Sequence, residues 1–555
     1  MTRRREILAV VALLLVQTGQ LVYAVGADGM TYDELLYVAA GYRQLALGDH
    51  RFGAEHPPLA LLLSALPLLP LHPVVRDLGA EEASKGWDWA YQFLHNDNSE
   101  IQLLHRSRLM VVVLSLLLSL ALWKWSRDAY GVSAGLAALC LSVFHPSLLA
   151  HGHLSTTEMA GTLSMILFSW ALWRFCEAPT WGMILGVATA LGAALATRLT
   201  GLLLIPLGLL ICVHWLYRSG DRRLAARRVA QLVVACLVLA PILIWAAYGF
   251  RYAAWPGEPD PQTGAMVWAR AIEGTPGAAV LGFLKAHQLF PAAYLASLQA
   301  YLIKSTVGHQ AYLLGQVSAT GWWYYYLIAA LVKNTPGFLL ALAIGAGLVR
   351  KTDRRAALHC LAPAVLMFAA ASLSRVQVGE RYILSVYAYL ILWLASMTPL
   401  VLRQKAGGAL AAAILVLHAA PALQTARAGY LPYFNFMVDH DLAHRVLADS
   451  NLDWGQDLPR LAAWSAQHPD RPLQVAYWGM DSPDVYGLVR EDLPGQMPYP
   501  AISLTRPPFT GWVAVSPTLL AGLYPPAGTE EILRSLSKRT PDDHAGVFLI
   551  YNLSR

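Results

Sequence analysis

Two adjacent carboxylates, Asp33 and Glu34, directly follow the first long apolar run of the chain. On a helix, Asp33 and Tyr37 share a face at the i, i+4 spacing, whereas Glu34 points about 100° away. We therefore expect the pair to divide its duties, with one carboxylate facing a reactant and the other held by the scaffold. A carboxylate beside an incoming hydroxyl is suited to general-base catalysis. A solvated acid or a helix cap is the alternative.

Clusters of Lys and Arg lie at one set of ends of the apolar runs. Four basic residues lie instead near the opposite ends, which lack such clusters. They are Arg198, Lys333, Arg375 and Arg381. An arginine fork can bind two phosphate oxygens, whereas lysine acts as a point charge, so Arg198 and Arg381 are the stronger candidates for a phosphate site. Snorkelling of these side chains to lipid head groups is the alternative.

Further polar candidates lie in segments between apolar runs that are predicted to face outward. Glu158 follows two threonines, a pattern that also fits a helix N-cap with an acidic first turn. Histidines beside acids can bind zinc, but no His-Glu-x-x-His spacing occurs, so hydrogen bonding is their default role. Neither the Asp33 site nor the Glu158 site has a clean Asp-x-Asp, so we expect no cofactor and leave a divalent metal open. The histidines are His56, His145, His151 and His153.

The composition requires a membrane protein. Hydrophobic residues make up 56% of the 555 residues and charged residues only 14%, against roughly 25% charged in a typical soluble chain. The net charge of +6 comes from short basic stretches beside apolar runs, which membrane orientation explains better than nucleic acid does. Nucleic-acid binding is therefore excluded. The five cysteines lie in or beside apolar runs, so no disulfide framework is expected.

About eleven apolar runs are predicted to span the membrane as helices. With an inside N-terminus, the basic stretches at 124–127, 218–228, 350–355 and 403–405 all fall on the cytoplasmic side. The eighth run is ambiguous, because Pro336 either breaks one long helix or separates an interfacial helix from a short span. Segment 59–71 is too short for a span and is expected to be interfacial or re-entrant. The runs are 7–25, 109–125, 131–147, 158–175, 181–197, 199–217, 229–249, 336–349, 357–374, 381–400 and 408–424.

This topology divides the chain into a transmembrane domain at 1–424 and a polar domain at 425–555 outside the membrane. The exported parts of the first domain are a loop at 26–108, which carries Asp33 and Glu34, and a loop at 250–325. The polar domain is expected to be a small α/β unit. Its predicted elements are a helix within 451–469 and strands within 472–479, 511–517 and 546–553.

Several motifs resemble the protein O-mannosyltransferase superfamily, glycosyltransferase family 39. Asp-Glu after the first span, then a glycine and His-Pro-Pro-Leu at 56–59, is similar to the first exported loop of that superfamily. Looser stretches resemble its bacterial, lipid-carrier-dependent members: HPSLLAHGHLSTTEMAGT, ATRLTGLLLIPL, LVKNTPGFLL and GERYILSVYAYLILWLA. The segment YFNFMVDHDLAHRVLADSNLDWGQDL resembles a region after the last span of many such proteins.

The resemblance implies a C-type glycosyltransferase fold in a bacterial plasma (inner) membrane, with a cytoplasmic N-terminus and an extracytoplasmic C-terminal domain. A polyprenyl-phosphate sugar, mannose-like by family default, would be transferred with inversion to a hydroxyl of a protein, glycan or lipid. By motif position, Asp33 would be the general base and Glu34 would orient the base or position the acceptor. Tyr37, His56, His153 and Glu158 would line the substrate site, although Asp is commoner than Glu at position 158.

Other functions stay open at this stage. Aminoarabinose transfer to a lipid is less favoured, because that family generally has Lys where this chain has His56 before Pro-Pro-Leu. A proton-coupled transporter should show inverted repeats and charges near mid-span, whereas these charges cluster at span ends. An assembly protein that works through its outer domain would not need the Asp-Glu and His-Pro-Pro-Leu loop.

Overall fold

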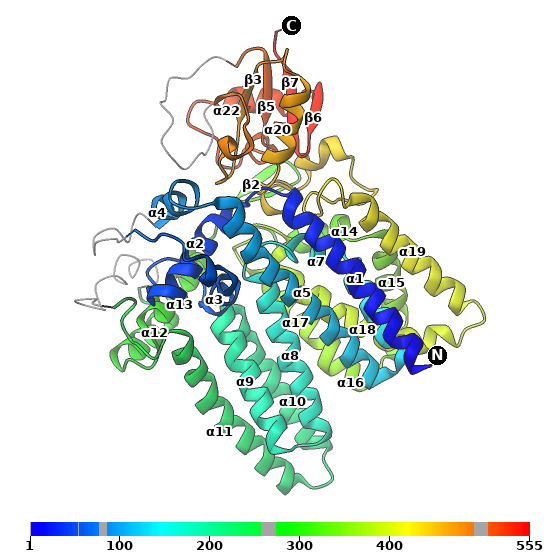
Figure 1. The fold of residues 1–555 in the computed structure, drawn as a ribbon. Helices are drawn as coiled ribbons and strands as arrows, with labels where there is room; N and C mark the ends of the chain where they lie inside the picture. Colours follow the sequence, from blue (N-terminus) through cyan, green and yellow to red (C-terminus); the bar gives the residue numbers. More distant parts are fainter. Residues whose placement is uncertain (1, 54, 77–85, 257–272, 493–508, 555) are drawn as a thin grey trace.

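The structure is a computed structural model that describes residues 2–53, 55–76, 86–256, 273–492 and 509–554. Long helices form the larger part of the molecule, and a small domain with a β-sheet sits at one end of them (Figure 1). The N-terminus and the α10–α11 loop lie at the opposite end (Figure 1). The predicted polytopic helical protein with a small C-terminal α/β domain is therefore confirmed.

In the described ranges, eight helices are long and apolar enough to cross a membrane. A short helical segment leads directly into three of them: η4 (Leu199–Leu203) into α10, α16 (Arg354–Ala356) with η7 (Ala357–Leu361) into α17, and η8 (Glu380–Ile383) into α18. The eight are α1 (Arg3–Ala27), α5 (Glu100–Tyr130), α8 (Glu158–Glu177), α10 (Leu204–Arg218), α11 (Arg222–Ala247), α17 (Ala362–Leu373), α18 (Leu384–Leu402) and α19 (Gly407–Thr425).

The other three predicted spans are shorter helices, so the count of eleven divides into eight long helices and three short ones. They are α6 (Val132–Val143), α9 (Trp181–Thr197) and α15 (Pro336–Gly347). At about 1.5 Å per residue, a helix of 12 residues such as α6 covers only about 18 Å. Proline limits the length of two of these helices. Pro146 begins a separate helix, α7 (Pro146–His151), after α6 has ended, and Pro336 begins α15.

Proline also determines how the ambiguous eighth run folds. The chain forms α14 (Tyr325–Lys333), leaves the helix at Asn334, and enters α15 with Thr335 accepting a hydrogen bond from the Phe338 N–H at its N-cap. The segment is therefore a helix followed by a short helix rather than one long broken span. Segment 59–71 forms α3 (Leu59–Ala65), which continues as a 3-10 turn, η1 (Leu66–Leu71).

Helix α18 forms the centre of the helical part, with eleven buried residues and contacts to α5, α6, α8 and α17. The loops between spans add α2 (Tyr32–Leu47), α4 (Gly86–Tyr91), α12 (Pro276–Ala286) and α13 (Ala292–Val307), together with a hairpin of β1 (Ala311–Leu313) and β2 (Gln316–Ser318). These elements gather near the end that carries the C-terminal domain (Figure 1).

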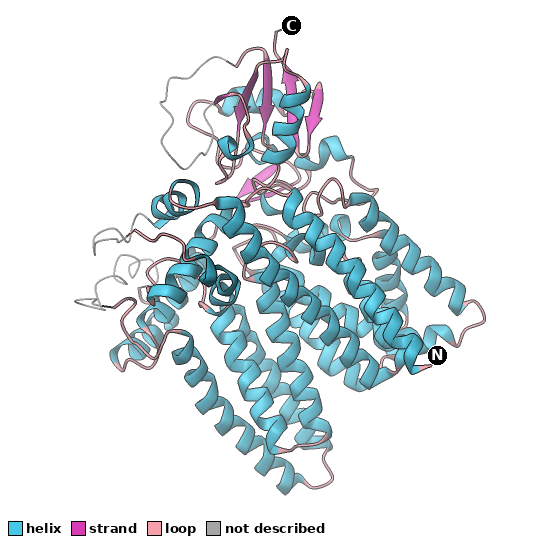
Figure 2. Ribbon diagram, in the orientation of Figure 1, coloured by secondary structure: helices cyan, strands magenta, loops and turns pink. Residues whose placement is uncertain are grey.

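The C-terminal domain is built on a five-stranded sheet in the order β4-β3-β5-β7-β6 (Figure 2). Strand β3 (Leu473–Ala476) pairs in parallel with β4 (Glu491–Asp492) and β5 (Trp512–Val515). Strand β7 (Phe548–Asn552) pairs antiparallel with β5 and with β6 (Asp543–Ala545). The helices are α20 (Leu458–Gln467), α21 (Pro517–Leu520) and α22 (Glu530–Leu536), so the predicted helix and all three predicted strands are present.

The domain is packed firmly onto the helices. One apolar cluster joins Leu21 and Val25 of α1 to Trp454 and Trp478 of the domain. The C-terminal domain thereby covers the ends of the helices where the candidate residues gather.

Candidate active site

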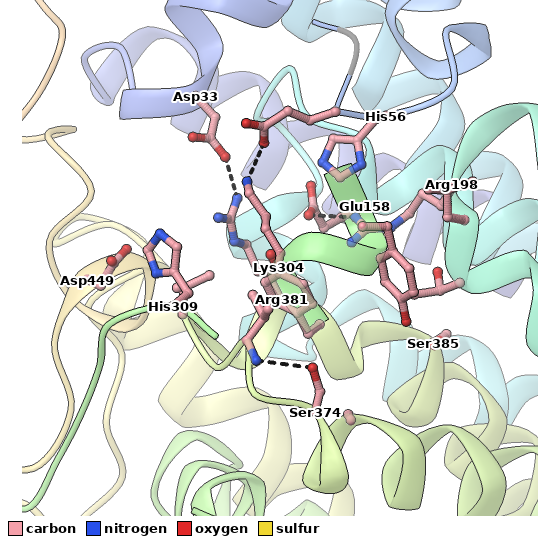
Figure 3. Close-up of a pocket in the computed structure, with 18 of the residues that line it drawn as sticks. Asp33, His56, Glu158, Arg198, Lys304, His309, Ser374, Arg381, Ser385 and Asp449 are labelled. Carbon is pink, nitrogen blue, oxygen red and sulfur yellow. Dashed lines mark hydrogen bonds and ion pairs between the residues drawn. The ribbon is translucent and has the colours of Figure 1, made fainter. Parts of the chain in front are cut away.

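A cavity of about 310 Å³ lies where the helices meet the C-terminal domain, and charged side chains from several elements converge on it (Figure 3). Its walls come from α2, the loop before α3, the start of α8, η4, α13, α17, η8 and the C-terminal domain. The polar lining includes Asp33, Tyr37, Glu55, His56, Glu158, Arg198, Lys304, His309, Arg381, Tyr382 and Asp449.

Asp33 lies in the first turn of α2 and faces this cavity, with its side chain 20% exposed. Its Oδ2 accepts a hydrogen bond of 2.7 Å from Nη1 of Arg381, which is 348 residues away in the sequence. The Arg381 guanidinium also lies 4.1 Å from the ring centroid of Trp454, and its Nε has no partner among the described residues. The predicted base and one of the two stronger predicted phosphate ligands are therefore in direct contact.

Arg198 and Glu158 form a second pair on the cavity wall. Nη1 of Arg198 donates to Glu158 Oε1 at 2.6 Å and to Thr157 Oγ1 at 2.9 Å. A Cβ at Gly161 would lie 2.5 Å from Cδ of Arg198, so glycine makes room for the arginine stem. Thr157 makes no side-chain cap hydrogen bond to α8, and Oε2 of Glu158 has no partner in the described chain. The cavity role of Glu158 thus has more support than a simple N-cap.

The third pair comes from Lys304 of α13 and Glu55, whose Nζ and Oε2 lie 2.6 Å apart at the more exposed rim. His56 follows Glu55 and packs edge-on to Tyr37, with 5.8 Å between ring centroids. Burial, assisted by the charge of Arg198, lowers the pKa of His56 to about 4, so the ring is neutral at physiological pH. A Cβ at Gly41 would lie 2.6 Å from the Leu61 carbonyl oxygen, so glycine allows α3 to pack closely on α2 below this loop.

Glu34 lies outside the cavity and is fully buried. Its oxygens accept hydrogen bonds from Arg108 Nε at 2.8 Å, Arg108 Nη2 at 2.6 Å and the Ser155 N–H at 2.6 Å. Together with Thr31 it also forms the capping box of α2. The two carboxylates do divide their duties, because Glu34 fixes the start of α2 and thereby positions Asp33.

Three other candidates are not among the residues that line the cavity. His153 contacts Asp28 Oδ2 at 2.9 Å and is fully buried. Lys333 donates to the carbonyls of Leu431 and Asn451 at 2.7 and 2.6 Å. Arg375 is exposed and donates to the Thr306 carbonyl at 2.6 Å. These three predicted site residues therefore hold the structure around the site rather than line it.

Several residues that line the cavity were not predicted from the sequence. Glu55 precedes the His-Pro-Pro-Leu motif, and Lys304 lies in the predicted exported loop at 250–325. Asp449 and Trp454 lie in the segment that resembles the region after the last span of bacterial relatives. Burial raises the pKa of Asp449 to about 7, against the opposing charge of Arg381. Glu55, Asp449 and Trp454 thus lie beside or within a motif with a recognisable signal, whereas Lys304 does not.

In the described ranges, no group of three or more His, Cys, Asp or Glu side chains is arranged to hold a metal ion. The cavity contains three cation–carboxylate pairs and the neutral His56.

A family model described as dolichyl-phosphate-mannose-protein mannosyltransferase matches residues 103–245. No curated protein sequence matches the chain at the required significance. Among solved structures, ArnT from Cupriavidus metallidurans bound to undecaprenyl phosphate is similar at 16% identity, covering 99% of this chain and 98% of that chain, with a TM-score of 0.47.

Two further solved structures are similar. The oligosaccharyltransferase of Archaeoglobus fulgidus matches at 10% identity over 89% of this chain and 65% of that chain, with a TM-score of 0.49. The S. cerevisiae Pmt1-Pmt2 complex bound to its sugar donor matches at 15% identity over 45% of this chain and 34% of that chain, with a TM-score of 0.36. These similarities concern the fold only.

Proposed function

We propose that the chain is a membrane glycosyltransferase that transfers a sugar from a polyprenyl-phosphate donor to an acceptor hydroxyl, and the family match over residues 103–245 supports this proposal. Asp33 acts as the general base and the transfer inverts the anomeric centre. The sugar is mannose-like by family default. The acceptor belongs to a protein, a glycan or a lipid.

The observation that carries this proposal is the placement of Asp33 in a cavity that also holds Arg381, Arg198 and Lys304. A sugar on a lipid phosphate already has a good leaving group, so the reaction needs one base and cations more than it needs a general acid. The acceptor oxygen forms a bond to C1 of the sugar and gives its proton to Asp33. The bond from C1 to the phosphate oxygen breaks, and the phosphate keeps the electron pair.

The cations suit that departing charge. Arg381 has an unpartnered Nε among the described residues, and a guanidinium fork can contact two phosphate oxygens. Arg198 and Lys304 are two further cationic side chains that line the cavity. The apolar lining of Met165, Leu199, Leu203, Met367 and Ala370 comes from the helical part, which suits the first isoprene units of the donor.

The proposed location is the outer face of a bacterial inner membrane. The basic stretch around the α10–α11 loop and the N-terminus lie at the end opposite the C-terminal domain (Figure 1). Because cytoplasmic loops are enriched in Lys and Arg, that end faces the cytoplasm. The cavity and the C-terminal domain then face outward.

The test is a transfer assay on the purified protein in lipid with a panel of radiolabelled polyprenyl-phosphate sugars. The wild type should consume or hydrolyse one donor. Asp33→Asn should lower turnover by about 10²–10⁴-fold and still bind that donor, because the amide keeps the shape but is not a base. Asp128→Asn, an exposed change at the far end of α5, is the matched control. Full turnover in Asp33→Asn would refute the assignment, and absence of any donor binding would favour a transporter.

A further inference from the structure

Besides its cations, the cavity has a wall of aromatic rings to which the transfer chemistry assigns no role. Tyr32 comes from α2, while Trp478 and Tyr524 come from the C-terminal domain. The Trp478 ring lies between the other two, with its centroid 5.1 Å from Tyr32 at an interplanar angle of 19° and 5.7 Å from Tyr524 at 7°. We call these three rings the aromatic wall. Since each ring is packed on the next, the wall is rigid before a ligand arrives.

The aromatic wall and the apolar lining come from different elements of the structure. Tyr32 directly precedes Asp33 in α2, and the other two rings belong to the domain that covers the helices. The apolar side chains Leu203 and Met367 come from the helical bundle instead. A polyprenyl chain held by that lining leaves the aromatic wall to the second substrate, the one that brings the hydroxyl to Asp33.

Asp449 adds a carboxyl group for the second substrate. It lines the cavity together with Tyr524 and is 7% exposed. The Ser450 N–H donates to its Oδ1 at 2.6 Å. The backbone of Asp449 has a φ of +56°, a conformation that residues other than glycine rarely adopt. Such strain is common where a side chain is held for function, and here it holds a carboxyl beside the aromatic wall.

We propose that the aromatic wall and Asp449 form the acceptor subsite, and that the acceptor is a saccharide. This inference rests on the proposed function and names its second substrate. The parts of these rings that face the cavity offer apolar C–H surface to a sugar, while phenol hydroxyls and a carboxylate exchange hydrogen bonds with its hydroxyls. One saccharide hydroxyl gives its proton to Asp33, its oxygen bonds to C1 of the donor sugar, and the lipid phosphate leaves.

The other two acceptor classes fit this set of residues less well. An extended peptide is commonly bound by adding to the edge of a sheet, and none of the described lining residues belongs to a strand. A lipid acceptor needs an apolar path of its own, whereas the apolar lining comes from the helices that face the donor chain. A wall of rings with one carboxyl suits a compact molecule rich in hydroxyls.

The experiment uses the full-length protein in lipid with the labelled donor that the wild type hydrolyses. Neutral di- and trisaccharides, a Ser/Thr-rich peptide and a lipid with a free hydroxyl are offered as acceptors. We expect transfer to a saccharide. Tyr524→Phe and Asp449→Asn should raise the KM for the saccharide by about tenfold, with a smaller change in kcat. The matched control is Tyr551→Phe, since Tyr551 is buried in β7 and its hydroxyl has no partner in the described chain.

The outcomes separate the two proposals. If the wild type binds no polyprenyl-phosphate sugar, the proposed function fails and the saccharide acceptor fails with it. If the donor is bound and hydrolysed but only the peptide or the lipid accepts the sugar, the inference alone is overturned. An unchanged saccharide KM in both Tyr524→Phe and Asp449→Asn would likewise overturn the assignment of the subsite.

Discussion

The cavity and a buried cluster of charged residues, here called the polar layer, contain the same residue types, yet they differ in how completely their polar atoms are hydrogen-bonded. In the polar layer, formed by Asp28, Glu34, Arg108, His153 and Arg460, each carboxylate accepts two or more hydrogen bonds from other side chains or backbone N–H groups. In the cavity, Asp33 accepts one from Arg381, and Oε2 of Glu158 has no partner among the described residues.

This contrast shows what separates a structural charge from a reactive one in this protein. Glu34 and Asp33 are neighbours in sequence and lie in the same helical turn, so neither residue type nor position alone distinguishes them. A carboxylate whose lone pairs are all used cannot take a proton from a substrate without losing a bond. Breaking the polar layer should therefore cost stability, whereas changing the cavity should cost turnover.

The largest effect on stability is expected from Glu34→Gln. It leaves the buried Arg108 guanidinium without its countercharge, which should lower the free energy of unfolding by about 3–5 kcal/mol. Thermal or denaturant unfolding in lipid or detergent measures this. Glu177→Gln is the control, because its partner Arg355 is 67% exposed and the pair should contribute about 1 kcal/mol or less. Equal unfolding free energies for Glu34→Gln and Glu177→Gln would contradict the difference drawn here between buried and exposed ion pairs.

A pH effect should follow from Asp453, a buried carboxyl of the C-terminal domain. Burial raises its pKa from 3.8 to about 7, so the folded protein holds this proton more tightly than the unfolded chain does. Its contribution to stability therefore falls as pH rises from about 4 to 7 and is constant above that range, by a few kcal/mol at most.

The measurement for Asp453 is the difference in unfolding free energy between the wild type and Asp453→Asn at several pH values. Taking the difference removes the opposite contributions of histidines with lowered pKa. We expect the wild type to lose stability relative to the variant between pH 4 and 7. A difference that does not depend on pH would show that this carboxyl is not protonated in the folded state.

Donor affinity should respond to the cavity arginine and not to its exposed neighbour. Arg381→Ala should raise the Kd for the polyprenyl-phosphate sugar by about 10–100-fold, because it removes a charge-assisted contact to phosphate. Arg375→Ala should leave the Kd unchanged, since Arg375 is exposed and lies outside the cavity. Equal effects of the two changes would mean that charge near the site matters and the cavity geometry does not.

The smallest effect is expected at the rim. Lys304 and Glu55 are 42% and 55% exposed, so Lys304→Ala should change the free energy of unfolding by less than about 1 kcal/mol. Any loss of donor affinity in this variant should shrink at high salt, because exposed charges are screened. Binding measured at low and at high ionic strength tests this. A salt-independent loss would place Lys304 in the polar interior of the site.

The sequence predicted the helices well, because long apolar runs and prolines are local signals. The sequence did not predict correctly where some of these helices begin and end. Pro146 and Pro336 shortened two spans, and Asn334 separated α14 from α15. These boundaries depend on capping and on packing with neighbouring helices, which hydropathy does not contain.

The candidate site could be predicted only in part, because its residues converge from distant segments. Asp33 and Arg381 were chosen separately from local motifs, yet their contact spans 348 residues. Lys333 resembled a phosphate ligand by position, but its ammonium donates to two backbone carbonyls in the interior. Asp449 was missed because its segment carried a family resemblance but no local reason to choose that carboxyl.

The most direct test compares Asp33→Asn with Glu34→Gln in the same preparation, measuring sugar transfer per folded molecule and unfolding free energy. Asp33→Asn should lose about 10²–10⁴-fold in turnover with a smaller loss of stability than Glu34→Gln. Glu34→Gln should lose stability while its folded fraction keeps turnover within about tenfold of the wild type. Near wild-type turnover in Asp33→Asn would contradict the account.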